Sequence, residues 1–319
     1  MNKKKTLKIG IVMDPIQLIK IEKDSSFAIL LEAQKRNHQI HYIEMNDLYL
    51  KKNQAYARTR FIKIQKKIKN HFNFIQEQNI SLNELDVILM RKDPPFNMEF
   101  IYATYILERA EKNGVLIINK PKSLRDCNEK IFASLFDKFT PDTLVTRNIS
   151  QMYNFWKKYK DVIIKPLDNM GGTNVFRIKE NDTNFLVISE IMTNYEKKYC
   201  MIQSYLPSVK YGDKRILIIN GKVIPWCVAR IPKKDETRAN IAAGGKAQIK
   251  KLDEKDWEIA NYLSPILKEK GLIFVGLDII GDKLTEINVT SPTCICEIEL
   301  NINISITGML MDYIENQIY

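Results

Sequence analysis

The stretch VGLDIIGDKLTEINVTSPT, residues 275–293, places two carboxylates and an amide around one short turn. Two β-rich runs flank a Gly-Asp pair, which predicts an antiparallel hairpin. With a three-residue loop at 281–283, Asp278 would lie opposite Glu286, and Asn288 would project from the same face because strand side chains alternate. Such oxygen ligands suit Mg²⁺, which binds through one or two carboxylates plus substrate phosphates. A solvated hairpin that happens to be acidic fits the same spacing.

The composition is that of an ordinary globular protein with two or three domains. The 319 residues are 45% hydrophobic and 27% charged, which argues against disorder. The sequence has no run of about 18 apolar residues, the pattern that would predict a membrane-spanning helix. The basic start resembles a signal peptide, but its apolar part is short and reaches Asp14. We therefore expect a protein with no membrane partner.

The five cysteines are odd in number and lack paired zinc spacing, which fits a reducing, cytoplasmic setting. Cys294 and Cys296 are either a reactive pair or two small half-buried residues.

The formal net charge of +11 raises the question of a nucleic-acid partner. The densest basic group spans residues 61–69, where lysines alternate with Phe61, Ile62 and Ile64. This spacing predicts an amphipathic helix with a solvated basic face, part of a longer helical region that reaches residue 78. Small polyanions such as nucleotides therefore fit better than nucleic acid.

Strands and helices alternate in the first part of the chain. Strands are predicted at 7–14, 38–45, 85–95 and 115–121, with helices at 27–37 and 100–114 and the longer helical region before residue 78. This order predicts a parallel, helix-covered sheet, which binds ligands beyond the carboxyl ends of its strands. Asp14, Arg91, Lys92 and Asp93 follow such ends.

Two lysines occupy unusual places after residue 126. Asp126 or Asn128 can cap a helix in which Lys130 lies in the first turn, where a cation opposes the helix dipole. Lys165 ends a strand that leads through Gly171 and Gly172 into another strand. Backbone N–H groups of such a loop can contact phosphate oxygens, although a glycine pair forms a plain hairpin turn more often.

Further along, Asn-Gly at 220–221 predicts a hairpin, and Arg215 and Arg230 fall on either side of it. The polar residues 231–248, which include Arg238 and Asn240, show no period. A loop of this size in a compact domain is either functional, such as a lid, or idle.

Six segments together resemble the bacterial glutathione synthetase family of the ATP-grasp superfamily. They are GIVMDPI, LMRKDPPF, KPLDNMGGT, DKRILIINGK, ETRANIAAGG and GLDIIGDKLTEINVTSPTC. The resemblance implies ATP-dependent ligation of γ-L-glutamyl-L-cysteine to glycine through an acyl phosphate, giving glutathione, ADP and phosphate. Another ATP-grasp carboxylate–amine ligase, or an inactive relative that binds nucleotide or RNA, is the alternative.

The resemblance also implies a fold and an assembly. An N-terminal α/β substrate-binding domain with a parallel sheet (1–125) would precede an ATP-grasp fold of two α+β units. These units are a small lid domain (126–200) and a C-terminal domain (201–319) with the Mg²⁺ site and the mobile loop 231–248. The cytoplasmic protein would form a homo-oligomer, a tetramer in the family.

Residue roles follow from the matched motifs. Mg²⁺, or Mn²⁺ in its place, would be bound by Asp278, Glu286 and Asn288. ATP would be bound by Lys130, Lys165, Asp168, Gly171, Gly172, Thr173, Gln203, Ser204, Tyr205 and Leu206. The catalytic cations would be Arg215, Arg230 and Arg238. The other substrates would contact Arg91, Arg238, Asn240, Ser291 and Thr293, with Glu297 nearby.

The chemistry agrees with this assignment. A carboxylate becomes an acyl donor once ATP phosphorylates it, so no side-chain nucleophile is needed, and the sequence lacks a Ser-His-Asp arrangement. Water would destroy the acyl phosphate, so a closing loop is required. The chain departs from the family pattern at Asn169, at 233–235, at Ala239 and at Cys296, where a basic residue is expected.

Overall fold

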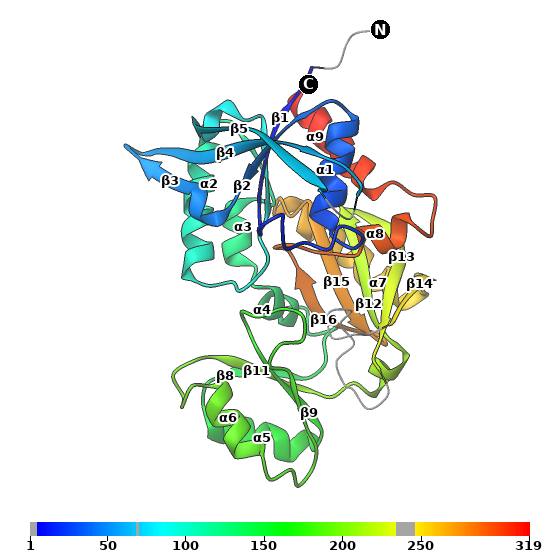
Figure 1. Cartoon of the computed structure of the whole chain (residues 1–319). Helices are drawn as coiled ribbons and strands as arrows, with labels where there is room; N and C mark the ends of the chain where they lie inside the picture. Colours follow the sequence, from blue (N-terminus) through cyan, green and yellow to red (C-terminus); the bar gives the residue numbers. More distant parts are fainter. Residues whose placement is uncertain (1–4, 68–69, 234–245) are drawn as a thin grey trace.

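The computed structural model describes residues 5–67, 70–233 and 246–319 (Figure 1). The predicted site residues Arg238 and Asn240 lie outside the described residues, as does most of the proposed lid at 231–248. Both ends of that segment are strand, because β13 continues to Ile231 and β14 begins at Lys246. In the described part of the chain, no helix is long and apolar enough to cross a membrane.

The first sheet has the order β3-β4-β2-β1-β6-β7, with β5 beside β4. Its strands are β1 (Lys8–Met13), β2 (Gln39–Ile43), β3 (Leu48–Lys51), β4 (Gln54–Ile64), β5 (Phe72–Ser81), β6 (Val87–Arg91) and β7 (Leu116–Ile118). β2, β1, β6 and β7 pair in parallel, as predicted, while β3, β4 and β5 extend the sheet with antiparallel pairs. Short 3₁₀ turns, η1 (Met45–Asp47) and η2 (Leu82–Glu84), flank this extension.

The predicted helical region before residue 78 is wrong, because this part of the chain is the β4–β5 hairpin. Burial along β4 has a period of two, with Ala55, Ala57 and Thr59 buried and Arg58 exposed. After a shift of register at Phe61/Ile62 the alternation resumes. The few apolar residues between 61 and 69 fit two patterns equally well. One is the 3.6-residue period of a helix, and the other is the two-residue period of a strand interrupted by a bulge.

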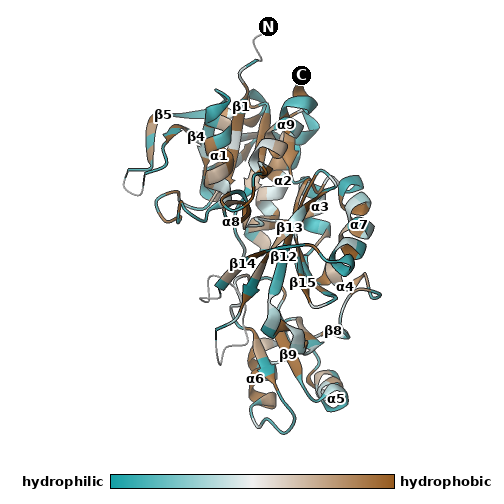
Figure 2. Ribbon diagram, turned by 90° about the vertical axis from the view of Figure 1, so that its right-hand side faces the viewer, coloured by the Kyte–Doolittle hydropathy of each residue, from teal (hydrophilic) through white to brown (hydrophobic). Residues whose placement is uncertain are grey.

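Helices cover both faces of this sheet, as predicted. α2 (Met98–Lys112) packs on one face, whereas α1 (Ser25–Lys35) packs on the other together with the C-terminal helix α9 (Ile306–Ile318). Arg36, at the end of α1, forms an ion pair with Asp312 of α9 at 2.6 Å. The C-terminal segment is thereby fixed to the N-terminal sheet. Figure 2 shows hydrophobic residues gathered where these elements meet.

A small four-stranded sheet, in the order β10-β9-β11-β8, forms the lower lobe in Figure 1. It contains β8 (Thr143–Thr146), β9 (Val162–Pro166), β10 (Phe176–Ile178) and β11 (Cys200–Ser204), covered by α5 (Ile149–Tyr159) and α6 (Phe185–Met192). This lobe has its own core, in which Trp156 stacks on Phe185 with 4.5 Å between ring centroids. The division into three domains stays a prediction. Because β11 pairs within this sheet, we propose that the second boundary follows Ser204.

The third sheet has the order β14-β13-β12-β15-β16. Its strands are β12 (Asp213–Ile219), β13 (Lys222–Ile231), β14 (Lys246–Lys251), β15 (Phe274–Ile280) and β16 (Lys283–Asn288). Helices α3 (Pro121–Asp126), α4 (Glu129–Ser134), α7 (Glu254–Glu269), α8 (Ile295–Glu299) and turn η3 (Pro207–Tyr211) surround it. The predicted Asn-Gly turn joins β12 to β13, with φ of 49° and 74° at its two residues. Those positive values suit the right-handed twist of a hairpin.

Candidate active site

The acidic hairpin consists of β15 and β16. Asp278 pairs directly with Glu286, as predicted, but by a different route. The turn has two residues, and Thr285 is an extra residue that shifts the register between Asp278 and Ile279. Its hydroxyl donates to the Asp278 carbonyl at 3.1 Å, which holds the bulge. The bulge therefore restores the pairing that the predicted three-residue loop would have given.

Two arginines neutralise Asp278. Arg215 of β12 donates through Nε and Nη2 to the two carboxylate oxygens at 2.5 and 3.0 Å. Arg230 of β13 lies 2.9 Å from Oδ2 and 2.6 Å from Asp213. Burial alone would raise the pKa of Asp278, but the two arginines hold it below its usual range. Gly276 makes room for the Arg215 side chain, because an added Cβ would lie 2.9 Å from its Cδ.

Two lysines neutralise Glu286. Lys130 of α4 and Lys165 of β9 place Nζ at 3.7 and 3.6 Å from its Oε1. Burial lowers the pKa of Lys165, an effect that Glu286 opposes. The pKa of Glu286 is lowered, since both lysines outweigh the effect of its burial. The predicted cap is confirmed, because Asn128 accepts from the Lys130 and Ile131 amides.

The glycine loop lies over this lysine pair. Lys130 Nζ donates to the Asn169 carbonyl at 2.8 Å, so the loop is tied to α4. Gly171 and Gly172 have φ of 67° and 77°, a left-handed region that favours glycine. Asp168 is held by Lys198 at 3.0 Å, and the Thr173 amide donates to Met170.

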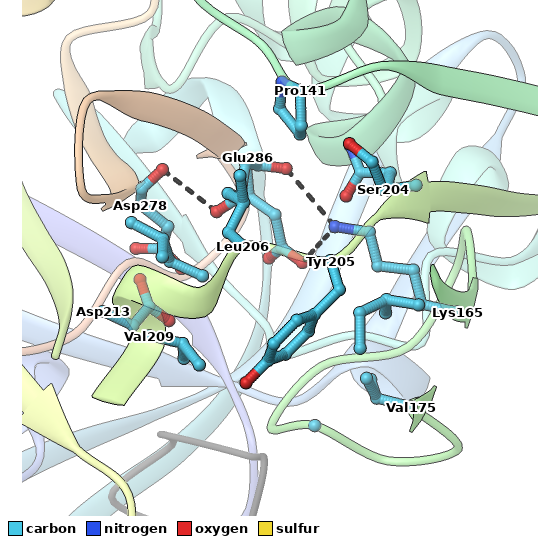
Figure 3. Close-up of a pocket in the computed structure, with 15 residues that line it drawn as sticks. Pro141, Lys165, Val175, Ser204, Tyr205, Leu206, Val209, Asp213, Asp278 and Glu286 are labelled. Carbon is cyan, nitrogen blue, oxygen red and sulfur yellow. Dashed lines mark hydrogen bonds and ion pairs between the residues drawn. The ribbon is translucent and has the colours of Figure 1, made fainter. Parts of the chain in front are cut away.

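Two pockets meet at the acidic hairpin. The first lies between the small sheet and the third sheet, and Figure 3 shows Lys165, Tyr205 and Glu286 converging on it. Its walls also include the predicted residues Gly172, Gln203, Ser204, Leu206 and Asp278. The second is lined by Gly171, Arg215, Arg230, Asp278, Glu286, Asn288, Ser291 and Thr293. Asp278 and Glu286 belong to both walls. Asp168 and Thr173 line neither pocket.

Arg91, predicted to bind substrate, lies at the carboxyl end of β6 and is 4% exposed. Its Nε donates to Ser26 at 3.0 Å and its Nη2 to the Pro292 carbonyl at 2.9 Å. Its Nη1 is buried with no hydrogen-bond partner among the described residues. Burial lowers the pKa of Arg91 to about 10.

Sequence reasoning missed two residues of the site. Asp213 lines the first pocket and binds Arg230, and burial raises its pKa to about 6. It precedes Arg215 by two positions in one strand, so strand alternation could have identified it. Glu129 Oε1 accepts from the amides of Val289 and Thr290 at 2.9 and 3.0 Å and fixes α4 to the end of β16. Nothing in the sequence indicated this contact.

The donor atoms of the hairpin suit a hard cation. Asn288 donates through Nδ2 to the Gly276 carbonyl at 3.2 Å, which leaves its side-chain oxygen to act as a ligand beside Glu286. Among the described residues, no group of three or more His, Cys, Asp or Glu side chains could hold a metal. A site with two carboxylates and one amide is incomplete by itself and would rely on ligand oxygens such as those of phosphates.

Comparison with known proteins places both parts of the chain in one family. Residues 7–125 match the prokaryotic glutathione synthetase N-terminal domain, and residues 129–303 match its ATP-grasp domain. The chain is 73% identical over 319 residues to a glutathione synthetase of Buchnera aphidicola subsp. Schizaphis graminum, with 100% of both chains covered. It is 60% identical to that of Escherichia coli K12, covering 97% of this chain and 98% of the other.

Solved structures agree on the fold. D-cycloserine synthetase DcsG superposes with a TM-score of 0.68 at 13% identity, covering 98% of this chain and 100% of the other. D-alanyl-alanine synthetase A of Vibrio cholerae gives 0.58 at 13%. The fold and the charged cleft define an ATP-grasp protein, an ATP-dependent ligase. The chain belongs to the prokaryotic glutathione synthetase family.

Proposed function

We propose that the chain joins γ-L-glutamyl-L-cysteine to glycine at the acidic hairpin, with ATP as the energy source. The γ-phosphoryl group of ATP passes to the cysteinyl carboxylate, giving an acyl phosphate and ADP. The amine of glycine then attacks the acyl carbon, loses a proton and displaces phosphate, which gives glutathione. The observation that carries this proposal is the meeting of two pockets at Asp278 and Glu286, where four cations converge.

The first pocket is proposed to hold ATP. The segment 203–206 would border adenine, and Lys130 and Lys165 would bind phosphates beneath the glycine loop. Burial favours deprotonation of Lys165, and its nearest anion is Glu286, so a phosphate would restore charge balance. The lysines act by charge neutralisation and alignment, which are the main contributions to phosphoryl transfer.

Asp278, Glu286 and Asn288 are proposed to bind Mg²⁺, with Mn²⁺ as a substitute. A bound cation would supply positive charge to the transferring phosphoryl group. Glu286 would then contact the cation as well as the two lysines. Asp278 would contact the cation as well as Arg215 and Arg230, and the two guanidinium groups could also bind phosphoryl oxygens.

The second pocket is proposed to hold the peptide and glycine. Arg215 and Arg230 line it beside Asp278, where they can bind the reacting carboxylate and stabilise charge on the transferring phosphoryl group. Ser291 and Thr293 also line it, on either side of Pro292, whose carbonyl accepts from Arg91. The predicted contributions of Arg238 and Asn240, and closure by loop 231–248, belong to the same proposal.

The setting of the enzyme follows from the same reasoning. The five cysteines are free, which fits a reducing compartment where ATP is plentiful, so we place the protein in the cytoplasm. A homo-oligomer, tetrameric as the resemblance implies, is part of this proposal.

The test is ADP release from ATP and Mg²⁺ with γ-glutamylcysteine, with and without glycine, together with detection of glutathione by mass spectrometry. Glycine should raise ADP release strongly, with one glutathione formed per ADP. Alanine and β-alanine serve as matched acceptors. Equal stimulation by all three would point to a different carboxylate–amine ligase. Nucleotide binding without peptide-dependent ADP release would point to an inactive relative.

A further inference from the structure

Arg91 is a buried cation with no ion pair among the described residues. Two of its three nitrogens bind the neutral oxygens of Ser26 and Pro292, and the third binds none. Its guanidinium lies over the ring of Phe274, with 4.9 Å from Cζ to the ring centroid. A buried charge without a counterion is costly, and the usual remedies are an ion pair or a bound ligand.

Two carboxylates lie near Arg91 without touching it. Asp93 follows Arg91 by two residues, and Asp24, which accepts from the Phe27 amide at 2.7 Å as the N-cap of α1, precedes Ser26 by two residues. Neither carboxylate forms an ion pair, because no lysine or arginine nitrogen of the described residues lies within 4.0 Å of its oxygens. Burial raises the pKa of both carboxyls, and Arg91 partly opposes the effect. The three charged groups are therefore neighbours that form no ion pair with one another.

Two other charged residues near Arg91, Lys92 and Asp14, form an ion pair with each other. Lys92 lies 2.8 Å from Asp14, whose other oxygen accepts from the Asp93 amide at 3.0 Å. Asp14 is thus neutralised within the protein and orients the backbone at Asp93. That leaves one cation and two anions whose charges have no contacting counterion among the described residues.

We propose that Asp93, assisted by Asp24, binds the free α-ammonium group of the γ-glutamyl residue, while Arg91 Nη1 binds its α-carboxylate. This inference rests on the proposed function. A γ-glutamyl peptide carries both charges of an amino-acid head on one carbon, so it fits a separated cation and anion as no simple acyl group does. The head would lie at the part of the second pocket whose wall includes Pro94, the residue after Asp93, and Ser291, the residue before Pro292.

This arrangement makes Asp93 and Asp24 specificity-determining residues. The reacting end of the peptide would lie at Arg215 and Arg230. The head group would bind in the part of the same pocket that Pro94 and Ser291 line. A peptide without the amino group would leave two half-buried carboxylates unsatisfied, and polar sites reject analogues most strongly when their own polar groups lose a partner. The enzyme should therefore discriminate at a position remote from the bond that forms.

The experiment compares γ-glutamylcysteine with glutarylcysteine, which lacks only the α-ammonium group, by kcat/KM for ADP release. The wild type should prefer the natural peptide by about 100-fold or more. In Asp93→Asn this preference should fall below about 10-fold, because kcat/KM drops for γ-glutamylcysteine and stays unchanged for glutarylcysteine. Asp24→Asn should show a smaller change of the same kind, since asparagine still caps α1. Glu22→Gln, a charge change at an exposed position of the same loop, is the matched control.

Three outcomes separate the ideas. If wild type forms no acyl phosphate with γ-glutamylcysteine, the proposed function fails. If it uses both peptides equally, or if Asp93→Asn keeps the full preference, the head-group site is refuted and the function stands. Should the variants not fold, melting temperatures of the wild type decide. γ-Glutamyl-α-aminobutyrate should then raise the melting temperature more than glutaryl-α-aminobutyrate, and equal shifts would refute the site.

Discussion

Two charged regions of the molecule are built in opposite ways. Around the acidic hairpin, Asp278 and Glu286 each contact two cations, and Asp213 contacts Arg230. Around the β6 end, Arg91 binds only neutral groups, and its neighbour Asp93 forms no ion pair among the described residues. The charged groups of the first region are in ion pairs before any ligand arrives, and those of the second region are not.

The difference reflects what each region has to do. The hairpin has to receive phosphates and a metal ion, whose charges partly cancel one another, so the internal ion pairs can be exchanged for ion pairs with the ligands. The β6 end has to recognise a head that carries both charges. If its cation and anion met each other, the head group would have to break that pair before binding. Charges fixed apart are already arranged for the ligand.

The strongest way to break this comparison is to remove one anion of the hairpin. Glu286→Gln should lower turnover by at least about 10³-fold, because the proposed metal ion loses an anionic ligand and both lysines lose their counterion. ADP release under saturating substrates measures the effect. Glu77→Gln, at an exposed position of the β4–β5 hairpin, should leave turnover unchanged. Retained activity in Glu286→Gln would contradict the metal assignment.

The paired state of the hairpin predicts a large loss of stability when Asp278 is neutralised. Asp278→Asn leaves Arg215 without its counterion inside the protein, so the free energy of unfolding should fall by about 3–5 kcal/mol. Urea unfolding followed by circular dichroism measures it. Asp312→Asn, which removes a solvent-exposed partner of Arg36, should cost less than about 1 kcal/mol. Similar losses in both variants would mean that the buried pair is not special.

The raised pKa of Asp213 predicts that the stability of the hairpin region depends on pH. Its pKa is about 6 in the folded protein and 3.8 when unfolded, so the folded state holds the proton to higher pH. Its contribution to stability is therefore present below pH 3.8 and is lost as pH rises through 6. From pH 4 to 8 the wild type should lose about 2–3 kcal/mol of unfolding free energy relative to Asp213→Asn. A constant difference between the two proteins across this range would show that Asp213 does not titrate there.

The sequence predicts the acidic hairpin well because its signal is local. A Gly-Asp turn between two β-rich runs leaves few registers, and the polar residues at every second position select one of them. The pairing of Asp278 with Glu286 was correct even though the turn is shorter than predicted. The Asn-Gly hairpin and the Asn128 cap were found for the same reason, since each depends on neighbouring residues.

The features that the sequence does not predict depend on contacts between residues far apart in the chain. The sequence predicts a helix in place of the β4–β5 hairpin because the bulge in this hairpin disturbs the strand period. The contact of Glu129 with β16 joins residues 160 positions apart, and no pattern in the chain signals it. Whether Arg91 has an ion pair likewise depends on how three separate segments pack. The roles of the site residues remain predictions that the experiments above address.

The smallest expected effect tests the unpaired region itself. Arg91→Gln removes a buried charge that contacts no anion, so the free energy of unfolding should rise by about 1 kcal/mol. The relief of burial, which lowers the pKa of Arg91 to about 10, outweighs two lost hydrogen bonds to neutral groups. Urea unfolding of the ligand-free protein measures the change, and the same variant should require at least about 10-fold more γ-glutamylcysteine for half-maximal ADP release. A loss of stability like that of Asp278→Asn would show that the Arg91 charge is already balanced in the free enzyme, and the contrast between the two regions would disappear.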